Sequence, residues 1–265
     1  MRFPPVPPES KNQINKAGKL LAKGSTAPED IARAGDLGNR WRACHAYPLN
    51  TFQATLRTRL ARNYRQDAIA AQRLKRMSTI IDKLRRYRAM QLTTMQDIAG
   101  VRAILESAED VDRLIDEYKT GTRFEHELID EKDYIAFPRS EDGYRSYHLI
   151  YRYRNFRNSL CDGLRVEMQV RTRLQHIWAT AVETMGTFLG QALKSRQGDQ
   201  EWIDFFAIVS SAFAYMEGRP LVPRFDSLTQ EKTFHAVVDA EKGLGALDKM
   251  MAFSTAVKQL PSRSA

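Results

Sequence analysis

The chain is poor in cysteine and has no long apolar run, and each of these lacks excludes a class of protein. Its 265 residues include two cysteines, Cys44 and Cys161, which lack the close spacing of zinc ligands and which we expect to be free core thiols. The sequence contains no stretch of about 18 apolar residues, so it does not predict a membrane span. The first ten residues hold four prolines and no apolar segment of a secretory signal. We therefore expect a cytoplasmic protein without membrane contact.

Charge is abundant and unevenly distributed. The net charge is +9, and residues 51–90 carry all of that excess, with eleven Lys or Arg and two Asp. Residues 106–133 are acidic, with eleven acids and four bases. A basic block beside an acidic block favours a polyanionic ligand at one place, although a solvated helix face would give the same counts.

The hydrophobic pattern predicts helices at both ends of the chain and a mixed core between them. We expect one or two short helices in residues 11–38 with glycine breaks, an irregular segment at 39–50 and a long helix over 51–90 with a break near Gln66. Strands are predicted at 97–105, 124–135, 147–154 and 164–171. Further helices are predicted at 107–119 (begun by a Ser-x-x-Asp cap), 173–193, 200–217 and 230–256, with breakers at Gly186, Gly190 and 217–223.

These elements predict an α+β fold in which a mixed sheet is flanked by helices. No internal repeat is present, and the apolar content suffices for one core with a helical appendage. We divide the chain into a partly helical extension at 1–50, a core at 51–195 and a C-terminal helical region at 196–265.

The predicted strand at 164–171 alternates strictly between apolar and polar side chains. Every second residue from Leu164 to Val170 is apolar, so Glu167 and Gln169 fall on the opposite, polar face. Asp97 opens another predicted strand. If the two strands are neighbours, the carboxylates of Asp97 and Glu167 converge, and such a pair can hold Mg²⁺. The alternative for Asp97, taken singly, is a helix or strand cap, and the alternative for the polar row is an ordinary solvent-exposed face.

The segment from Arg73 to Lys83 combines cations with a hydroxyl at helical spacing. On a helix, Lys75, Thr79 and Lys83 would lie on successive turns of one side. Such a ladder suits a triphosphate, whose negative charge needs cations in the ground and transition states. The alternative is a solvated basic face.

The segment 132–148 combines cations with aromatic rings. Gly143 permits a tight turn that would present Tyr144 beside Arg139 and His148, as stacking on a nucleobase requires. Lys132 and Arg139 could meet phosphates. The alternative is a hairpin turn with core aromatics.

Taken together, these segments resemble the synthetase domain of RelA/SpoT-type enzymes, which make the alarmones ppGpp and pppGpp. The similar segments occur in the family's order and cover residues 73–180. They are RLKRMSTIIDK at 73–83, DIAGVRAI at 97–104, KDYIAFP at 132–138, DGYRSYH at 142–148 and VEMQVRT at 166–172, followed by LQHIWA at 174–179. The resemblance implies a nucleotidyltransferase-like mixed sheet flanked by helices.

The resemblance also implies an activity: Mg²⁺-dependent transfer of pyrophosphate from ATP to a ribose 3′-hydroxyl of GDP or GTP. Asp97 would bind Mg²⁺, and Glu167 would assist the metal and activate the acceptor hydroxyl. Arg73 would contact adenine and Tyr144 the acceptor base. The implied nucleotide-binding set is Arg73, Lys75, Thr79, Lys83, Lys132, Arg139, Tyr144 and His148, while Arg102 and Gln169 fall on motif positions without a fixed role.

The sequence departs from the family's pattern at several places. It contains no His-Asp dipeptide of the alarmone hydrolases and no long regulatory region, so we expect a small single-domain synthetase. Asp130 stands where the family often has a basic residue. Residues 139–142 read Arg-Ser-Glu-Asp, where alarmone makers usually have Lys and a short Pro-Asn turn.

These departures leave the acceptor open. Some small synthetases are toxins that pyrophosphorylate the 3′ CCA end of tRNA, and others make the adenosine alarmone (p)ppApp. The segment 41–57 resembles what precedes the core in such toxins, so tRNA and a cognate antitoxin protein are candidate partners. A non-catalytic module that binds RNA or a protein partner is the alternative from another class. The sequence does not predict the oligomeric state.

Overall fold

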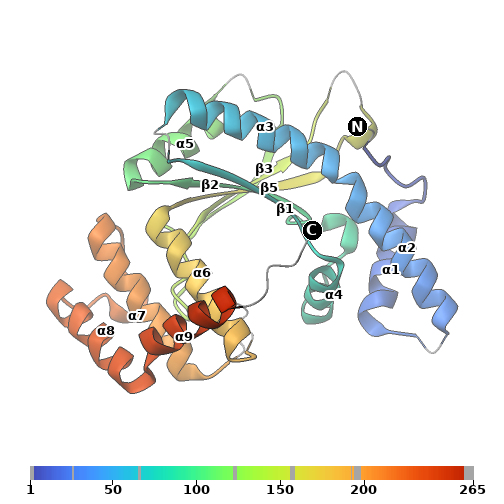
Figure 1. Cartoon of the computed structure of the whole chain (residues 1–265). Coiled ribbons are helices and arrows are strands. Elements are labelled where there is room, and N and C mark those ends of the chain that lie inside the picture. Colours follow the sequence, from blue (N-terminus) through green and yellow to red (C-terminus); the bar gives the residue numbers. More distant parts are fainter. Residues whose placement is uncertain are drawn as a thin grey trace. The chain divides into compact units, whose positions relative to one another are not determined.

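A computed structural model of the chain describes residues 3–25, 27–64, 67–121, 124–155, 159–191, 193 and 198–259 (Figure 1). The chain forms two compact units, which we describe separately. Unit 1 comprises Met1–Lys132 and His148–Val170, and unit 2 comprises Asp133–Tyr147 and Arg171–Ala265. The division into three parts at residues 50 and 195 stays a prediction.

Unit 1 contains the β-sheet and the helices of the N-terminal half. In chain order its elements are α1 (Lys11–Lys23), α2 (Pro28–Cys44), α3 (Ala46–Asn63), β1 (Ile69–Leu74), α4 (Met77–Arg86), η1 (Leu92–Thr94), β2 (Ala99–Leu105), α5 (Ala108–Thr120), β3 (Glu127–Asp133), β4 (Tyr147–Arg152), η2 (Ser159–Cys161) and β5 (Arg165–Thr172). The last residue of β3, the first of β4 and the last two of β5 are grouped with unit 2.

The five strands form one mixed sheet in the order β1-β2-β5-β4-β3. β1 pairs antiparallel with β2, from Ile69 opposite Ile104 to Leu74 opposite Ala99. Helices α3 and α5 lie along one face of this sheet (Figure 1). Val166, Met168 and Val170 of β5 are fully buried, as their alternation predicts. The α+β prediction is confirmed, and β5 lies directly beside β2.

The long helix predicted over 51–90 is wrong. Residues 46–63 are helical and so are residues 77–86, but Ile69–Leu74 between them is a strand. Pairing with β2 supplies the backbone hydrogen bonds of this segment, and such tertiary contacts override the helix preference of residues such as Ala70 and Ala71. Arg73 therefore lies on a strand and Lys75 precedes α4.

The glycine breaks predicted in residues 11–38 are also wrong, except at Gly24, where φ is +85°. Helices α1 and α2 run through the other glycines, and at Gly18 and Gly38 the lack of a side chain permits close packing. A Cβ on Gly18 would lie 2.9 Å from Cβ of Leu92, and one on Gly38 would lie 2.7 Å from Cε of Met77.

The segment 39–50 is helical, not irregular. It contains the end of α2 and the start of α3, and Pro48 falls in the first turn of α3, where a missing N–H does no harm. Its aromatic Trp41 is 5% exposed, so the segment's apolar side chains pack in the core.

The helix predicted at 107–119 is confirmed as α5, and the Oγ of Ser107 accepts a hydrogen bond from the N–H of Asp110. Cys44 and Cys161 are free and buried, as expected. Within the described ranges, none of the helices combines the length and the apolar content that a membrane span needs.

Unit 2 is helical apart from the loop and strand ends that it shares with the sheet. Its helices are α6 (Arg173–Phe188), α7 (Gln200–Glu217), η4 (Pro223–Phe225), α8 (Gln230–Leu244) and α9 (Ala246–Gln259). The predicted helix at 230–256 is divided at Gly245, where φ is +58°. Gly186 does not break α6. Because it lacks a side chain, the carbonyl oxygen of Gln191 packs closely against it, and an added Cβ would lie 2.8 Å from that oxygen.

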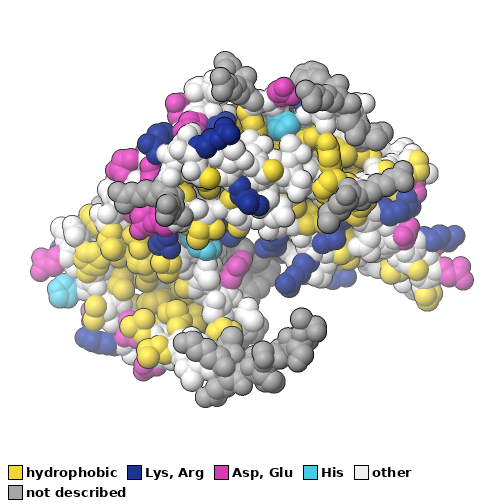
Figure 2. All heavy atoms as spheres, turned by 45° about the horizontal axis from the view of Figure 1, so that its top comes forward, with side chains coloured by type: hydrophobic (Ala, Val, Ile, Leu, Met, Phe, Trp, Pro, Cys, Tyr) yellow, Lys and Arg dark blue, Asp and Glu magenta, His cyan; other side chains and the backbone are white. Residues whose placement is uncertain are grey.

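The core of unit 2 forms where α6 and α7 pack together, around Trp178, Met185, Trp202 and Phe206. Trp202, Phe205 and Phe206 of α7 thus belong to this core. Large apolar side chains also remain exposed on the C-terminal helices, among them Phe234, and Figure 2 shows hydrophobic side chains gathered over this part of the chain.

Candidate active site

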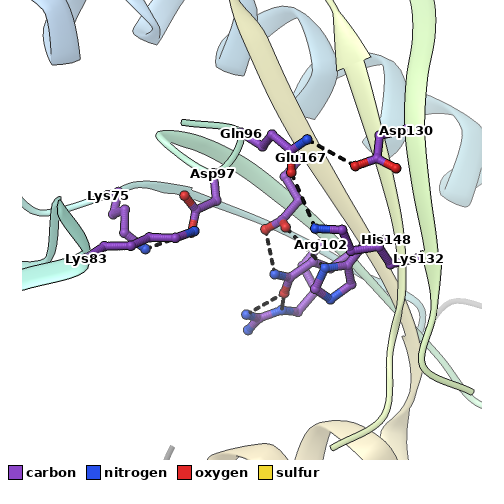
Figure 3. A network of polar contacts seen from close by, with 10 residues as sticks. Lys75, Lys83, Gln96, Asp97, Arg102, Asp130, Lys132, His148 and Glu167 are labelled. Atoms are coloured by element: carbon purple, nitrogen blue, oxygen red, sulfur yellow. Dashed lines mark hydrogen bonds and ion pairs between the residues drawn. The ribbon is translucent and has the colours of Figure 1, made fainter. Parts of the chain in front are cut away.

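Asp97 lies just before β2 and binds two lysines through one oxygen. Its Oδ2 is 2.8 Å from Nζ of Lys75 and 2.9 Å from Nζ of Lys83 (Figure 3). Burial opposes the charged carboxylate, but the two ammonium groups outweigh it and lower the pKa of Asp97 to about 2. The carboxylate is therefore fully ionised at neutral pH.

The position of Lys75 is set by its backbone rather than by a helix. Its N–H donates to the carbonyl of Ile98 at 2.8 Å, which ties the end of β1 to the residue beside Asp97. Its carbonyl accepts a hydrogen bond from Nε of Arg42 on α2 at 2.5 Å. Lys75 is 9% exposed, so both backbone contacts hold a nearly buried cation next to its carboxylate.

Glu167, on the polar face of β5, is held by a second cluster. Nδ1 of His148 on β4 lies 3.1 Å from its Oε1, and Nε2 of Gln169 donates to its Oε2 at 2.8 Å. A carboxylate only accepts, so Nδ1 of His148 carries the proton. Burial works to raise the pKa of Glu167 and so does Asp97, but the donors His148 and Gln169 prevail and lower it.

Arg102 fixes the orientation of the Gln169 amide. Its Nε and Nη2 donate to Oε1 of Gln169 at 3.2 and 3.0 Å, so the amide nitrogen must point to Glu167. Arg102 on β2 and Gln169 on β5 thus link the two neighbouring strands, and Gln169 lies on the same face of β5 as Glu167.

The two carboxylates satisfy a simple test for Mg²⁺. Figure 3 shows Asp97 and Glu167 as neighbours on one face of the sheet. Oδ1 of Asp97 is buried and has no hydrogen-bond partner among the described residues. The described part of the chain contains no group of three or more His, Cys, Asp or Glu arranged to hold a metal ion. A site with one or two carboxylates, completed by water and phosphate, is what Mg²⁺ commonly uses.

Lys132 and Asp130 of β3 meet at Gln96, a residue that the sequence did not single out. Nε2 of Gln96 donates to Oδ2 of Asp130 at 3.0 Å, and its Oε1 lies 3.5 Å from Nζ of the exposed Lys132. Gln96 precedes Asp97, so the acidic residue that departs from the family's pattern is tied to the segment that carries the first carboxylate (Figure 3).

The predicted ladder of Lys75, Thr79 and Lys83 is only partly present. Thr79 and Lys83 lie one turn apart on α4, but Lys75 approaches Asp97 from outside the helix. Arg73 is exposed on β1 and Thr79 is half-buried. Within the described part of the chain, neither side chain joins the hydrogen bonds of the two clusters.

Arg139 and Tyr144 belong to unit 2, in a loop of residues 139–146. Gly143 has φ +75°, as the expected tight turn requires. The guanidinium of Arg139 lies 4.4 Å from the centre of the Tyr144 ring and 3.0 Å from Oδ2 of Asp142. Arg145, by contrast, is 2% exposed and points into unit 2.

Two residues that hold the site carry no sequence signal that could have revealed them. Arg42 lies 33 residues before Lys75 on a segment that we expected to be irregular, and Gln96 has an ordinary polar side chain. Arg42 is connected with Asp97 only through its contact with Lys75, and Gln96, although it precedes Asp97, shows its role only through its contacts with Asp130 and Lys132.

The comparisons with known proteins concern mainly the sheet and its polar face. Residues 72–186 match the family described as the region found in RelA / SpoT proteins. GTP pyrophosphokinase YjbM of Bacillus subtilis is 36% identical over 110 residues, 41% of this chain and 51% of that protein. Protein Rv1366 of Mycobacterium tuberculosis is 32% identical over 196 residues, 71% of this chain and 63% of that protein. The chain thus spans about half to just under two thirds of these relatives.

Among solved structures, small alarmone synthetase 1 of Bacillus subtilis, bound to its product pppGpp, has a TM-score of 0.57 at 24% identity. The match covers 68% of this chain and 92% of that one, and it shows a shared fold. The family match and the curated relatives agree with the resemblance seen in the sequence. Residues 72–186 of this chain are a RelA/SpoT domain, and the chain is related to GTP pyrophosphokinases.

Proposed function

We propose that the chain is an ATP-dependent pyrophosphokinase that transfers pyrophosphate from ATP to the ribose 3′-hydroxyl of GDP or GTP and so makes (p)ppGpp. The observation that carries the proposal is that Asp97, which pairs with the cations Lys75 and Lys83, lies beside Glu167 on one face of the sheet. The kinship with GTP pyrophosphokinases supports the same reaction.

In the proposed reaction the acceptor hydroxyl attacks the β-phosphorus of ATP. A bond forms between that oxygen and the β-phosphorus, the bond from the β-phosphorus to the bridging oxygen of the α-phosphate breaks, and AMP leaves. Glu167 takes the hydroxyl proton. Its lowered pKa keeps it ionised, and each carboxylate oxygen can accept a further hydrogen bond beside those from His148 and Gln169.

The cations serve the donor nucleotide. Lys75 and Lys83 offset the triphosphate charge, and Lys132 faces the phosphates from β3. Asp97 and Glu167 would hold Mg²⁺, which in phosphoryl transfer neutralises charge on the phosphate oxygens. Arg73 and Thr79 are assigned to ATP by the resemblance alone. Arg102 keeps Gln169, and through it Glu167, in a fixed orientation.

The acceptor base is assigned to Tyr144, with Arg139 next to it, and the resemblance assigns His148 to nucleotide binding as well. An aromatic ring with a guanidinium over it is a common surface for nucleobase stacking. A guanosine nucleotide is the acceptor that fits the kinship with GTP pyrophosphokinases, while tRNA and adenosine nucleotides are outcomes that the experiment must separate.

The test follows label from ATP labelled in the β-phosphate, with GDP, GTP, ATP and deacylated tRNA offered separately. The decisive variant is Glu167→Gln, which keeps the shape of the side chain. The matched control is Glu127→Gln on β3, whose carboxylate pairs with Arg152 and Arg154 in the same sheet. We expect Glu167→Gln to lose about a hundredfold or more in kcat, the range for a lost general base, and Glu127→Gln to remain near wild type.

Each outcome changes the assignment differently. Label on GDP or GTP that disappears in Glu167→Gln supports the proposal. Label on tRNA or ATP alone would keep the reaction type and replace the acceptor. No transfer by a folded wild-type protein would contradict the proposal and favour a binding module, which would bind RNA in a salt-dependent manner regardless of the residue at 167.

A further inference from the structure

The 139–146 loop lies inside the RelA/SpoT region, but its anchor lies outside that region, on α7. Oγ of Ser210 donates a hydrogen bond to the carbonyl of Gly143 at 2.6 Å and accepts one from Nε of Arg145 at 2.9 Å. One hydroxyl therefore joins the residues on either side of Tyr144. All of these residues belong to unit 2.

The groups in this contact are buried and depend on one another. Ser210 and Arg145 are each 2% exposed, and Nη1 of Arg145 donates to the carbonyl of Ile135 at 3.3 Å. Burial lowers the pKa of Arg145 to about 10, against the raising effect of Glu217. A buried donor or acceptor that loses its partner is costly, so the hydroxyl of Ser210 is a central element of the anchor.

The turn is packed directly against α7. A Cβ on Gly143 would lie 2.8 Å from Cβ of Ser210 and 3.0 Å from Cα of Ala207, and the φ of +75° would disfavour a side chain in any case. The ring of Tyr144 lies against Trp178, with ring centres 6.3 Å apart. The indole of Trp178 in turn donates to the carbonyl of Phe206 on α7.

We propose that Ser210 is a positioning residue for the acceptor nucleotide: by holding Gly143 and Arg145, it sets the turn that presents Tyr144 to the acceptor base. This inference rests on the proposed function, in which Tyr144 stacks on that base. It extends the acceptor site to α7, beyond the part of the chain that the family match covers.

The test compares Ser210→Ala with Ser211→Ala. Ser211 is the next residue of α7 and is also fully buried, but its Oγ accepts from the N–H of Val222 at 3.1 Å and not from the loop. Both variants lose one buried hydroxyl. We expect Ser210→Ala to raise the KM for GDP about tenfold while kcat and the KM for ATP stay within about twofold, and Ser211→Ala to leave all three near wild type.

A second measurement reports on the loop without using activity. Trypsin cleaves after Arg139 and Arg145, and we expect cleavage at these sites to be about tenfold faster in Ser210→Ala than in Ser211→Ala, because a released turn opens more often. Melting temperatures of both variants reveal any general loss of stability.

The outcomes distinguish a failure of the positioning role of Ser210 from a failure of the proposed function. Equal KM values for GDP in the two variants, with an active wild type, would overturn the positioning role and leave the proposed function intact. Faster cleavage without a change in KM would do the same, since the loop would be anchored but not used for the acceptor. A folded wild type that transfers pyrophosphate to none of the four acceptors would refute the proposed function and with it the acceptor role of Ser210.

Discussion

Replacing Asp97 with Asn should lower the free energy of unfolding by about 2 kcal/mol at neutral pH. The estimate follows from the pKa of Asp97, which falls from an ordinary value of 3.8 to about 2 in the folded chain. A tenfold change in proton affinity corresponds to about 1.4 kcal/mol, so the ionised carboxylate contributes about 2 kcal/mol more than its protonated form. Asn resembles the protonated form in size and charge, and it leaves Lys75 and Lys83 without an anion.

The control is Asp82→Asn on α4. The side chain of Asp82 is 61% exposed, and its Oδ1 lies 3.5 Å from Nη1 of Arg85. Such an ion pair on the surface contributes little to stability. Urea denaturation followed by far-UV circular dichroism gives both free energies, and we expect Asp82→Asn to change stability by no more than about 0.5 kcal/mol. Equal stability of the two variants would refute the reasoning.

A double-mutant cycle sharpens this prediction. Lys83→Met should destabilise the wild type, because it removes one of the two cations on Asp97. The same change in the Asp97→Asn background should be neutral or stabilising, because it removes a partly buried cation that has lost its partner. If Lys83→Met cost the same in both backgrounds, the ion pair would contribute nothing to stability.

Three further predictions concern Arg42, the buried His45 and the binding of Mg²⁺. Arg42→Ala should raise the KM for ATP several-fold, because Lys75 loses its backbone anchor, whereas Arg33→Ala on the same helix, at a well-exposed position, should not. Burial lowers the pKa of His45 to about 4, so between about pH 4 and pH 6.5 the unfolded chain binds a proton at His45 that the folded chain does not bind. The free energy of unfolding is therefore highest above about pH 6.5 and falls by about 3 kcal/mol as the pH is lowered to about 4. Urea titrations at about pH 5 and about pH 7.5 should show a smaller difference for His45→Asn than for the wild type. Millimolar MgCl₂ should raise the melting temperature of the wild type and not of Asp97→Asn, and an equal rise in both would remove Asp97 from the metal site.

Sequence patterns predicted the parts of the fold whose elements signal locally. The alternation in β5 placed Glu167 on a polar face, and Ser107 marked the start of α5. The convergence of Asp97 and Glu167 needed β2 and β5 to be neighbours, and the sheet order provides that. The pattern alone could not give it, since strand order is decided by packing across the whole unit.

The errors have a common physical cause. β1 is short, most of its residues favour a helix, and its strand conformation depends on pairing with β2 about 30 residues away. Gly18 and Gly38 looked like breaks because propensity counts the missing side chain as a loss, while the folded unit uses the space for helix contacts. Arg42, Gln96 and Ser210 could not be predicted, since each acts through a contact with a residue far along the chain or through an unremarkable side chain.

The anchoring of Gly143 by Ser210 also means that a unit of sequence similarity need not be a unit of folding. Excising residues 72–186 would separate the turn from its partner 67 residues later and strip α6 of the aromatic side chains of α7. It would also remove α3 from the sheet and α1 from α4. The excised fragment would keep its motifs, but its apolar side chains would lose the surfaces against which they pack. We expect such a fragment to aggregate rather than fold.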